Sequence, residues 1–165
     1  MLRKKCECVS QALLQDPKFK AFLKDMVTTM HREEGVGLAA NQVGRDLSAI
    51  VLECCSSRRY PQADDFKLET YVNPRILEYS SDKETDWEGC LSIPGYRGLV
   101  PRSRSIVFEG TTPDGETVRK KVEGFQARVF QHEVDHINGF FYVDRMTDLK
   151  TWMHLDEFKR LSSDR

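Results

Sequence analysis

Residues 131–136 read Gln-His-Glu-Val-Asp-His and lie in a run whose apolar residues have helical spacing. The residues that would share the apolar face of this helix are Ala127, Phe130, Val134 and Ile137. Asn138-Gly139 follows the run and offers a left-handed end to a helix. The sequence therefore predicts a helix from about Gly124 to Asn138 with one buried face.

This predicted helix also carries residues suited to metal chemistry. Residues four apart share a helix face, so His132 and His136 could bind one metal ion. A metal ion lowers the pKa of a bound water from about 15.7 to near 7. Glu133 lies about 100° around the helix from His132, where its carboxylate could take a proton from that water and pass it to a leaving group. A purely structural zinc site would need four protein ligands and would leave Glu133 without a task.

The third metal ligand is left open by the residues themselves. A metzincin protease would need histidine where Tyr142 stands, so the sequence does not fit that class. Glu157 could complete the site of a thermolysin-like endopeptidase. The other candidate is Cys90, which lies upstream in Glu88-Gly89-Cys90-Leu91-Ser92.

Helical and strand patterns alternate along the rest of the chain. Asp16 and Pro17 predict the start of a helix that runs to Glu33, with Gly35 as its stop. Short strands are predicted at 49–52 and 70–72, the second ended by Asn73-Pro74, and the stretch 56–67 is predicted to be a loop. A hairpin is predicted from 105–109 to 117–123 around a turn at 112–115. The tail 149–161 is weakly helical, with Trp152 and Phe158 as its apolar anchors. This order predicts one α+β domain over residues 1–165.

Composition excludes several classes of protein. The 165 residues carry 25 Lys and Arg against 26 Asp and Glu, so no basic excess suggests a nucleic-acid binder. No apolar run approaches the roughly 18–20 residues that span a bilayer, and no secretory signal is expected. The five cysteines are odd in number, which favours free thiols in a reducing compartment. A cytoplasmic protein without a membrane partner is therefore expected.

Three blocks of sequence follow one another in a recognisable order. They are Gly35-Val36-Gly37-Leu38-Ala39-Ala40-Asn41-Gln42, Glu88-Gly89-Cys90-Leu91-Ser92 and Gln131-His132-Glu133-Val134-Asp135-His136. They resemble the G-[IV]-G-L-A-A-x-Q, E-G-C-L-S and Q-H-E-x-D-H blocks of the peptide deformylase family. The resemblance covers nearly the whole chain and implies an α+β fold, with mixed or antiparallel sheets around a central metal-binding helix.

The resemblance implies a full set of site residues and partners. The metal ligands would be Cys90, His132 and His136, and Glu133 would be the general acid and base. Gln42 and the backbone N–H of Leu91 would stabilise the oxyanion. The family usually holds Fe²⁺, which Zn²⁺, Ni²⁺ or Co²⁺ can replace. The substrates would be nascent polypeptides that begin with N-formyl-methionine, met close to the ribosome exit site.

Substrate contacts are also expected near this centre. The missing side chains of Gly35 and Gly37 would let a peptide backbone lie close to Val36. Arg97 would contact substrate carbonyls or remain a solvated charge. Phe125 and Val129 would line the methionine pocket or pack in the core.

Other readings of the same residues remain open. Asp135 is expected to orient a ligand histidine, with a pair to Arg102 as the alternative. The chain as a whole could instead be an endopeptidase that uses Glu157, or a metal-stabilised binding domain without turnover. Gln42 argues against the binding domain, which has no need of an oxyanion donor.

Overall fold

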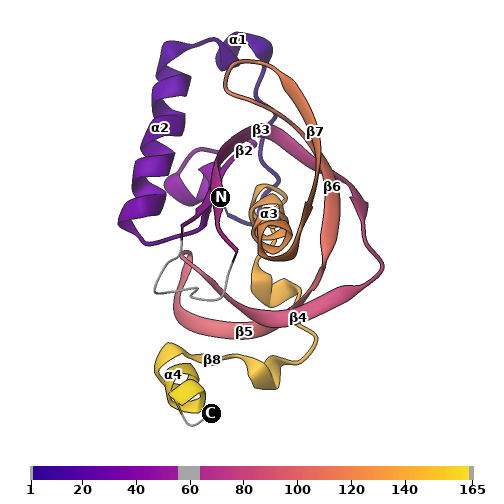
Figure 1. Cartoon of the computed structure of the whole chain (residues 1–165). Helices are drawn as coiled ribbons and strands as arrows, with labels where there is room; N and C mark the ends of the chain where they lie inside the picture. Colours follow the sequence, from indigo (N-terminus) through magenta and orange to yellow (C-terminus); the bar gives the residue numbers. More distant parts are fainter. Residues whose placement is uncertain (1, 56–63, 164–165) are drawn as a thin grey trace.

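The computed structural model describes residues 2–55 and 64–163 of the chain (Figure 1). Its helices are α1 (Gln11–Leu14), α2 (Pro17–Arg32), α3 (Gly124–Ile137) and α4 (Leu155–Ser163). Its strands are β1 (Gly37–Ala39), β2 (Ala49–Cys54), β3 (Phe66–Tyr79), β4 (Lys83–Cys90), β5 (Ile93–Ser103), β6 (Ser105–Thr111), β7 (Thr117–Glu123) and β8 (Met153–His154). Short 3₁₀ turns lie at η1 (Ala40–Val43), η2 (Tyr142–Asp144) and η3 (Leu149–Thr151). The prediction of an α+β fold with antiparallel sheets is confirmed.

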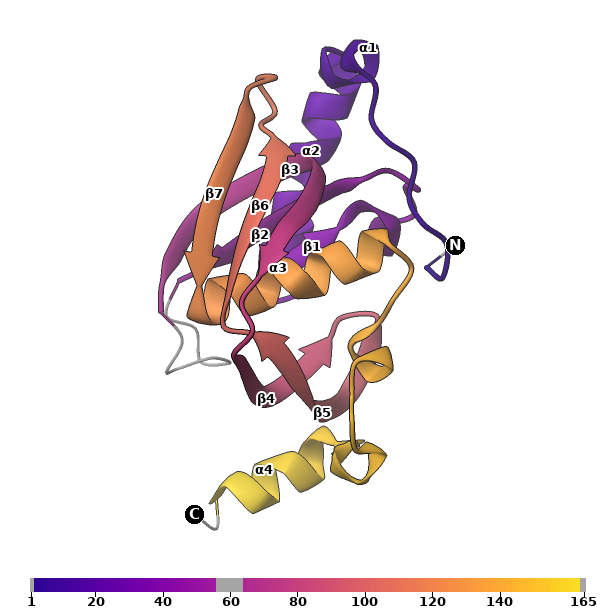
Figure 2. The same ribbon diagram turned by 90° about the vertical axis from the view of Figure 1, so that its right-hand side faces the viewer.

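Two antiparallel sheets lie on either side of helix α3. One sheet has the order β1-β2-β3-β6-β7 and the other the order β4-β5-β8. Figures 1 and 2 show α3 between the five-stranded sheet and the β4–β5 ribbon, and α2 on the opposite face of the five-stranded sheet. The site residues of α3 are therefore held between two layers.

Strand β2 shows how the five-stranded sheet is covered on both faces. Ile50 and Leu52 pack into the cluster that contains Phe130 of α3. Their neighbours Ala49 and Val51 pack into the cluster formed with α2. Alternate residues of a strand point to opposite faces, so a strand buried on both sides reads as a continuous apolar run.

Helix α2 confirms the predicted start and the predicted end near Glu33, but Gly35 does not act as the left-handed stop. The Asp16 side chain caps its first turn by accepting from the backbone N–H of Lys18 at 2.8 Å. At the other end the left-handed residue is Glu34, with a φ of 51°, whereas Gly35 donates its N–H to the Met30 carbonyl. The absence of a side chain at Gly35 instead leaves room for Leu91, whose Cδ1 would lie 3.0 Å from a Cβ there.

The strand predictions are right in place but short in extent. The hairpin of β6 and β7 is confirmed, with Thr111 opposite Thr117. The strand predicted at 70–72 continues through Asn73-Pro74, where register shifts mark a bulge. Of the loop predicted at 56–67, residues 56–63 lie outside the described part, and 66–67 belong to β3.

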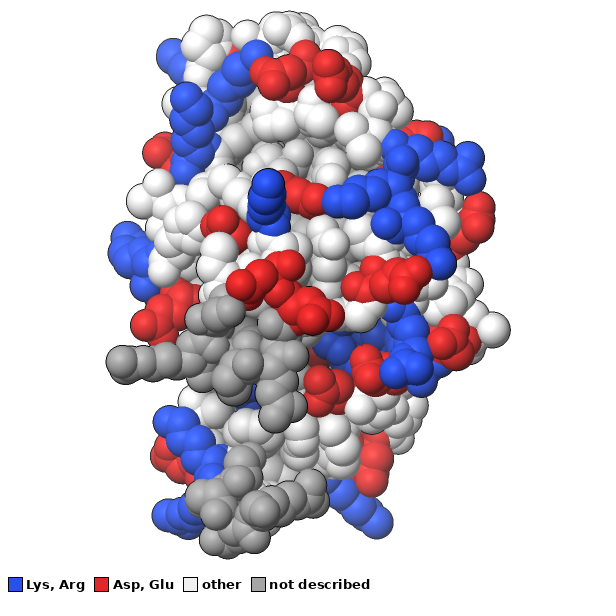
Figure 3. All heavy atoms as spheres, in the orientation of Figure 1, with Lys and Arg blue, Asp and Glu red and all other residues white. Residues whose placement is uncertain are grey.

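The charged side chains on the surface and the state of the cysteines can be compared with the expectations from composition. Basic and acidic side chains are interspersed over the face shown in Figure 3. All five cysteines are free, and burial together with the Asp46 carboxylate raises the pKa of Cys6 to about 12. None of the helices within residues 2–55 and 64–163 has the length and apolar character needed to cross a membrane.

Candidate metal centre and active site

Helix α3 holds its polar residues rigidly because both faces are buried. Its C-cap residue Asn138 donates from its side chain to the Val134 carbonyl at 2.8 Å. Gly139 then turns the chain with a φ of 83°, and a Cβ there would lie 2.7 Å from the Arg3 carbonyl oxygen. Only glycine fits this position, so the helix ends directly after His136 and Ile137.

Cys90 and the two histidines of α3 bring three donor atoms together. Cys90 Sγ lies 3.2 Å from His136 Nε2, which lies 3.2 Å from His132 Nε2. All three donor atoms lie within 4.8 Å of one another. Donors bound at about 2.0–2.3 Å to one tetrahedral ion would be roughly 3.3–3.6 Å apart. The two 3.2 Å separations are therefore close to those of one thiolate and two imidazoles around a divalent ion.

Glu157 does not lie in this cluster. It belongs to α4, its side chain is more than half exposed, and its carboxylate accepts a hydrogen bond from Arg160 at 2.7 Å. The third donor beside the histidines is Cys90, at the end of β4. The arrangement therefore favours Cys90 over Glu157 as the third ligand.

Glu88 orients His132 from the side opposite the cluster. Its Oε2 lies 2.9 Å from His132 Nδ1, which leaves Nε2 of the ring to face Cys90 and His136. Burial alone would raise the pKa of Glu88, but Arg102 and His132 hold it well below its usual range. The sequence assigned no separate role to Glu88, although a ligand histidine calls for an acceptor on its second nitrogen.

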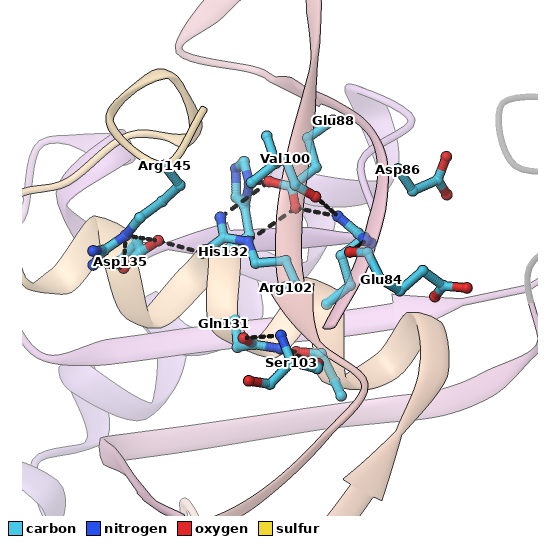
Figure 4. Close-up of polar contacts among 12 residues, drawn as sticks. Glu84, Asp86, Glu88, Val100, Arg102, Ser103, Gln131, His132, Asp135 and Arg145 are labelled. Atoms are coloured by element: carbon cyan, nitrogen blue, oxygen red, sulfur yellow. Dashed lines mark hydrogen bonds and ion pairs between the residues drawn. The ribbon is translucent and has the colours of Figure 1, made fainter. Parts of the chain in front are cut away.

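Asp135 does not have the role expected of it, which was to orient a ligand histidine. Its carboxylate accepts from Arg102 Nη1 at 2.5 Å and from Arg145 at 2.6 Å, and Figure 4 shows it on the far side of Arg102 from Glu88. The alternative, a pair with Arg102, is therefore confirmed. The reason is geometric, because residue 135 points toward β5 and β5 supplies Arg102.

Glu133 lies beside the cluster and is buried. Only 4% of it is exposed, and its Oε2 has no hydrogen-bond partner among the described residues. Burial raises its pKa to about 7, although the charge of His132 acts in the opposite direction. Such a carboxyl can both take and give a proton near neutral pH.

Gly37 makes room for Glu133. A Cβ on residue 37 would lie 2.8 Å from Cδ of Glu133, closer than two carbon atoms can approach. The glycine was expected to admit a peptide backbone. Its first effect is to admit the carboxylate.

Gln42 points its amide toward the same centre. Its Oε1 accepts from the backbone N–H of Ala39 at 2.8 Å, which turns the NH₂ group toward Ser92 Oγ at 3.1 Å and Cys90 Sγ at 3.7 Å. Gln42 itself lies in the turn η1, which begins at Ala40, so the backbone of this turn fixes the orientation. Gln42 thus places its side-chain N–H donors next to Cys90.

A cavity opens onto the cluster. Its walls include the predicted residues Gly35, Val36 and Gly37, as well as Gln42 and Leu91. Its lining also includes Trp87, Phe125, Arg128 and Val129.

Arg97 is not among the residues that line this cavity. It is 8% exposed and packs over the ring of Phe158, with 5.1 Å between the guanidinium carbon and the ring centroid. The alternative of a solvated charge is wrong for Arg97. The tail anchors are found as expected, since Phe158 also meets Trp87 edge-on and Trp152 stacks on Tyr96.

Comparisons with known proteins agree with this site. A sequence model of the family described as polypeptide deformylase matches residues 1–152. The chain is 42% identical over 140 residues to peptide deformylase 1 of Nitrosomonas europaea, covering 85% of this chain and 80% of the relative. It is 45% identical over 133 residues to peptide deformylase 1 of Bordetella pertussis, covering 81% and 76% of the two chains.

Solved structures show the same likeness. A class I type b peptide deformylase from Acinetobacter baumannii, solved with Met-Ala-Ser bound, matches with a TM-score of 0.86 at 38% identity. The match covers 88% of this chain and 91% of that one. The chain therefore belongs to the polypeptide deformylase family, metal-dependent enzymes that remove the N-formyl group from nascent polypeptides.

Proposed function

We propose that this protein is a catalytic domain that removes the formyl group from the formyl-methionine of new polypeptides and releases formate. The observation that carries the proposal is the convergence of Cys90 Sγ with Nε2 of His132 and of His136, beside a buried Glu133. We take residues 1–165 as one such domain, acting in the cytoplasm close to the ribosome exit site.

Cys90, His132 and His136 would hold one divalent metal ion. When bound, the ion supplies Lewis acidity, which polarises the formyl carbonyl and lowers the pKa of a water. We propose Fe²⁺ on the resemblance to the family alone. The ligand set by itself favours later divalent ions such as Ni²⁺ or Zn²⁺ over iron. Fe²⁺ is therefore the metal to be tested first.

Glu133 moves the proton in the proposed reaction. Its carboxylate takes a proton from the attacking water as the new C–O bond forms at the formyl carbon. It then gives that proton to the amide nitrogen as the C–N bond breaks, which yields formate and a free amino terminus. Burial, which raises the pKa of this carboxyl, favours its taking up the proton.

Two donors would stabilise the charge that develops on the formyl oxygen. They are the side-chain NH₂ of Gln42 and the backbone N–H of Leu91, both of which border the cavity. The Gln42 amide is already oriented by Ala39 before substrate arrives, so little reorganisation is needed.

The rest of the cavity would bind the peptide. The backbone of the substrate would lie along Gly35, Val36 and Gly37, and Arg97 remains a candidate contact for carbonyl groups of the peptide. The methionine side chain would enter between Phe125 and Val129. Burial of apolar surface there would favour methionine over polar first residues.

The direct test measures formate and metal in one sample. The protein is prepared anaerobically with Fe²⁺ and given a formyl-Met peptide, with the acetyl-Met peptide as control. We expect about one metal per chain and formate from the formyl peptide. Metal without formate would support a binding domain, and cleavage inside the peptide would support an endopeptidase.

Replacing Cys90 by serine is expected to cost most of the bound metal, whereas Glu157→Ala keeps it. The thiolate is a stronger ligand for these ions than a neutral hydroxyl, and Glu157 is exposed and paired with Arg160. Metal content by elemental analysis after gel filtration distinguishes the two variants. The reverse pattern would restore the endopeptidase reading.

Gly37→Ala is expected to lower kcat by about 100-fold, because the new Cβ displaces the Glu133 carboxylate while leaving the three metal donors in place. Gly35→Ala serves as the matched variant, with a smaller loss, since the closest atom to its Cβ, at 3.0 Å, is the end of the flexible Leu91 side chain. Steady-state kinetics and metal content check this. Equal losses in both variants would contradict the specific contact.

A further inference from the structure

Arg128 is a buried arginine that the proposed mechanism does not use. It lies on α3 four residues before His132, on the same face of the helix, and is 5% exposed. Its Nη1 donates to Glu88 Oε1 at 2.8 Å and to the Val100 carbonyl at 2.9 Å. Its Nη2 donates to the Glu84 carbonyl at 2.7 Å. One guanidinium thus ties α3 to both β4 and β5.

The Glu88 carboxylate is held by three partners at once. Its Oε1 accepts from Arg102 Nε at 2.9 Å and from Arg128 Nη1. Its Oε2 accepts from Arg102 Nη2 at 3.0 Å and faces His132 Nδ1 at 2.9 Å (Figure 4). With Oε1 occupied by two guanidinium groups, the carboxylate cannot turn away from the imidazole without losing charge-assisted hydrogen bonds.

Arg102 alone does not supply this restraint. Its guanidinium is shared between Glu88 and Asp135, and Asp135 also binds Arg145. The other two acceptors of Arg128 are neutral backbone carbonyls, so its full charge is directed at Glu88. Arg128 therefore gives the buried Glu88 carboxylate an arginine that it does not share with Asp135.

We propose that Arg128 is a positioning residue for the metal centre. It fixes Glu88, which in turn holds the His132 ring with Nε2 facing Cys90 and His136. The inference rests on the proposed ligand set. Its expected effect is on how long the metal stays bound, because groups that orient a ligand histidine typically change metal affinity by 10–100-fold.

The test follows metal loss rather than turnover. Protein loaded with Ni²⁺ is mixed with excess chelator, and the release of Ni²⁺ is followed over time for wild type and for Arg128→Gln, Arg128→Leu and Arg128→Lys. We expect Arg128→Gln and Arg128→Leu to release the metal 10–100-fold faster than wild type. Arg128→Lys should release the metal more slowly than these two variants but faster than wild type. Lysine keeps the positive charge but lacks the planar guanidinium with its several N–H donors.

Arg145→Gln is the matched control. It removes a guanidinium from the same charge network, but that guanidinium binds Asp135 and not Glu88. We expect its metal release to stay within about twofold of wild type. If Arg128→Leu does not fold, Arg128→Gln decides the result, because its amide can still donate to a backbone carbonyl.

Two results would overturn the proposal. One is wild-type release from Arg128→Gln, and the other is equally fast release from Arg145→Gln. Failure of the proposed function is recognised separately, as a wild-type protein that releases no formate with Fe²⁺. If that protein still binds Ni²⁺, the rates of Ni²⁺ release still test the role of Arg128. Thermal unfolding of the metal-free variants shows whether faster release merely reflects a loss of stability.

Discussion

Replacing Glu133 with glutamine is expected to lower the rate of formate release by about 10²–10⁴-fold while the bound metal stays near one per chain. The amide has nearly the shape of the carboxyl, so it fits the space that Gly37 leaves. It has no proton to exchange near neutral pH. The variant therefore loses proton transfer to and from the reacting groups, but keeps Cys90, His132 and His136.

The measurement compares formate release and metal content in the same preparations of wild type and Glu133→Gln. Glu157→Gln is the control, since that side chain is exposed on α4 and is expected to change neither quantity. Unchanged turnover in Glu133→Gln would remove the acid–base role. Loss of the metal in that variant would mean that Glu133 is a ligand, which its position outside the donor cluster does not predict.

The local part of this site could be predicted from sequence. His132, Glu133 and His136 lie within one helical turn or so of one another, so helix geometry alone relates them. Cys90 is remote in sequence, and no periodicity connects it to the helix. Its selection over Glu157 came from a family resemblance, and the structure supports it by placing Sγ beside His136.

The partners of the charged residues were harder to predict. Sequence favoured Asp135 of α3 as the group that orients a histidine, but the carboxylate that contacts His132 belongs to Glu88 on strand β4. The choice depends on how β4 and β5 pack against α3, since β5 carries Arg102 and β4 carries Glu88. Tertiary packing of this kind leaves no mark on the local pattern of residues.

The strands illustrate a second limit. The apolar run of β2 and the turn chemistry between β6 and β7 are strong local signals, and both elements were predicted. The Asn73-Pro74 pair reads as a strand end, yet β3 continues through it by a bulge in which the Asn73 side chain binds both backbone groups of Val9. Proline is tolerated in strands at such bulges. The compensation comes from a segment more than sixty residues away and is invisible in the local sequence.

Arg102→Leu is expected to lower the free energy of unfolding by about 3–5 kcal/mol, because it leaves two buried carboxylates without their shared partner. Arg102 is 5% exposed and binds both oxygens of Glu88 as well as Asp135. Arg128 and Arg145 remain on one carboxylate each, but neither can bridge the two. Leucine fills part of the volume, but it carries no charge and donates no hydrogen bond to either carboxylate.

This loss is expected to depend on pH in one direction. In the wild type the folded-state pKa of Glu88 lies well below the usual value of 4.5, so its ionised form contributes stability above about pH 4.5, and this contribution is lost as the pH falls toward the folded-state pKa. Without Arg102 the pKa of Glu88 in the folded state lies closer to its usual value. The difference between wild type and Arg102→Leu should therefore be largest near neutral pH and should narrow below about pH 4.5.

Denaturation of the metal-free proteins in guanidinium chloride at several pH values measures this difference, without a contribution from metal binding. Arg119→Leu is the matched control, since its pair with Glu78 is exposed on both sides and should contribute at most about 1 kcal/mol. A loss in Arg102→Leu no larger than in this control would mean that the charge network around Glu88 contributes little to the stability of the fold. Its retention in the chain would then have to be explained through the orientation of His132 alone, which the metal-release experiment on Arg128 measures independently.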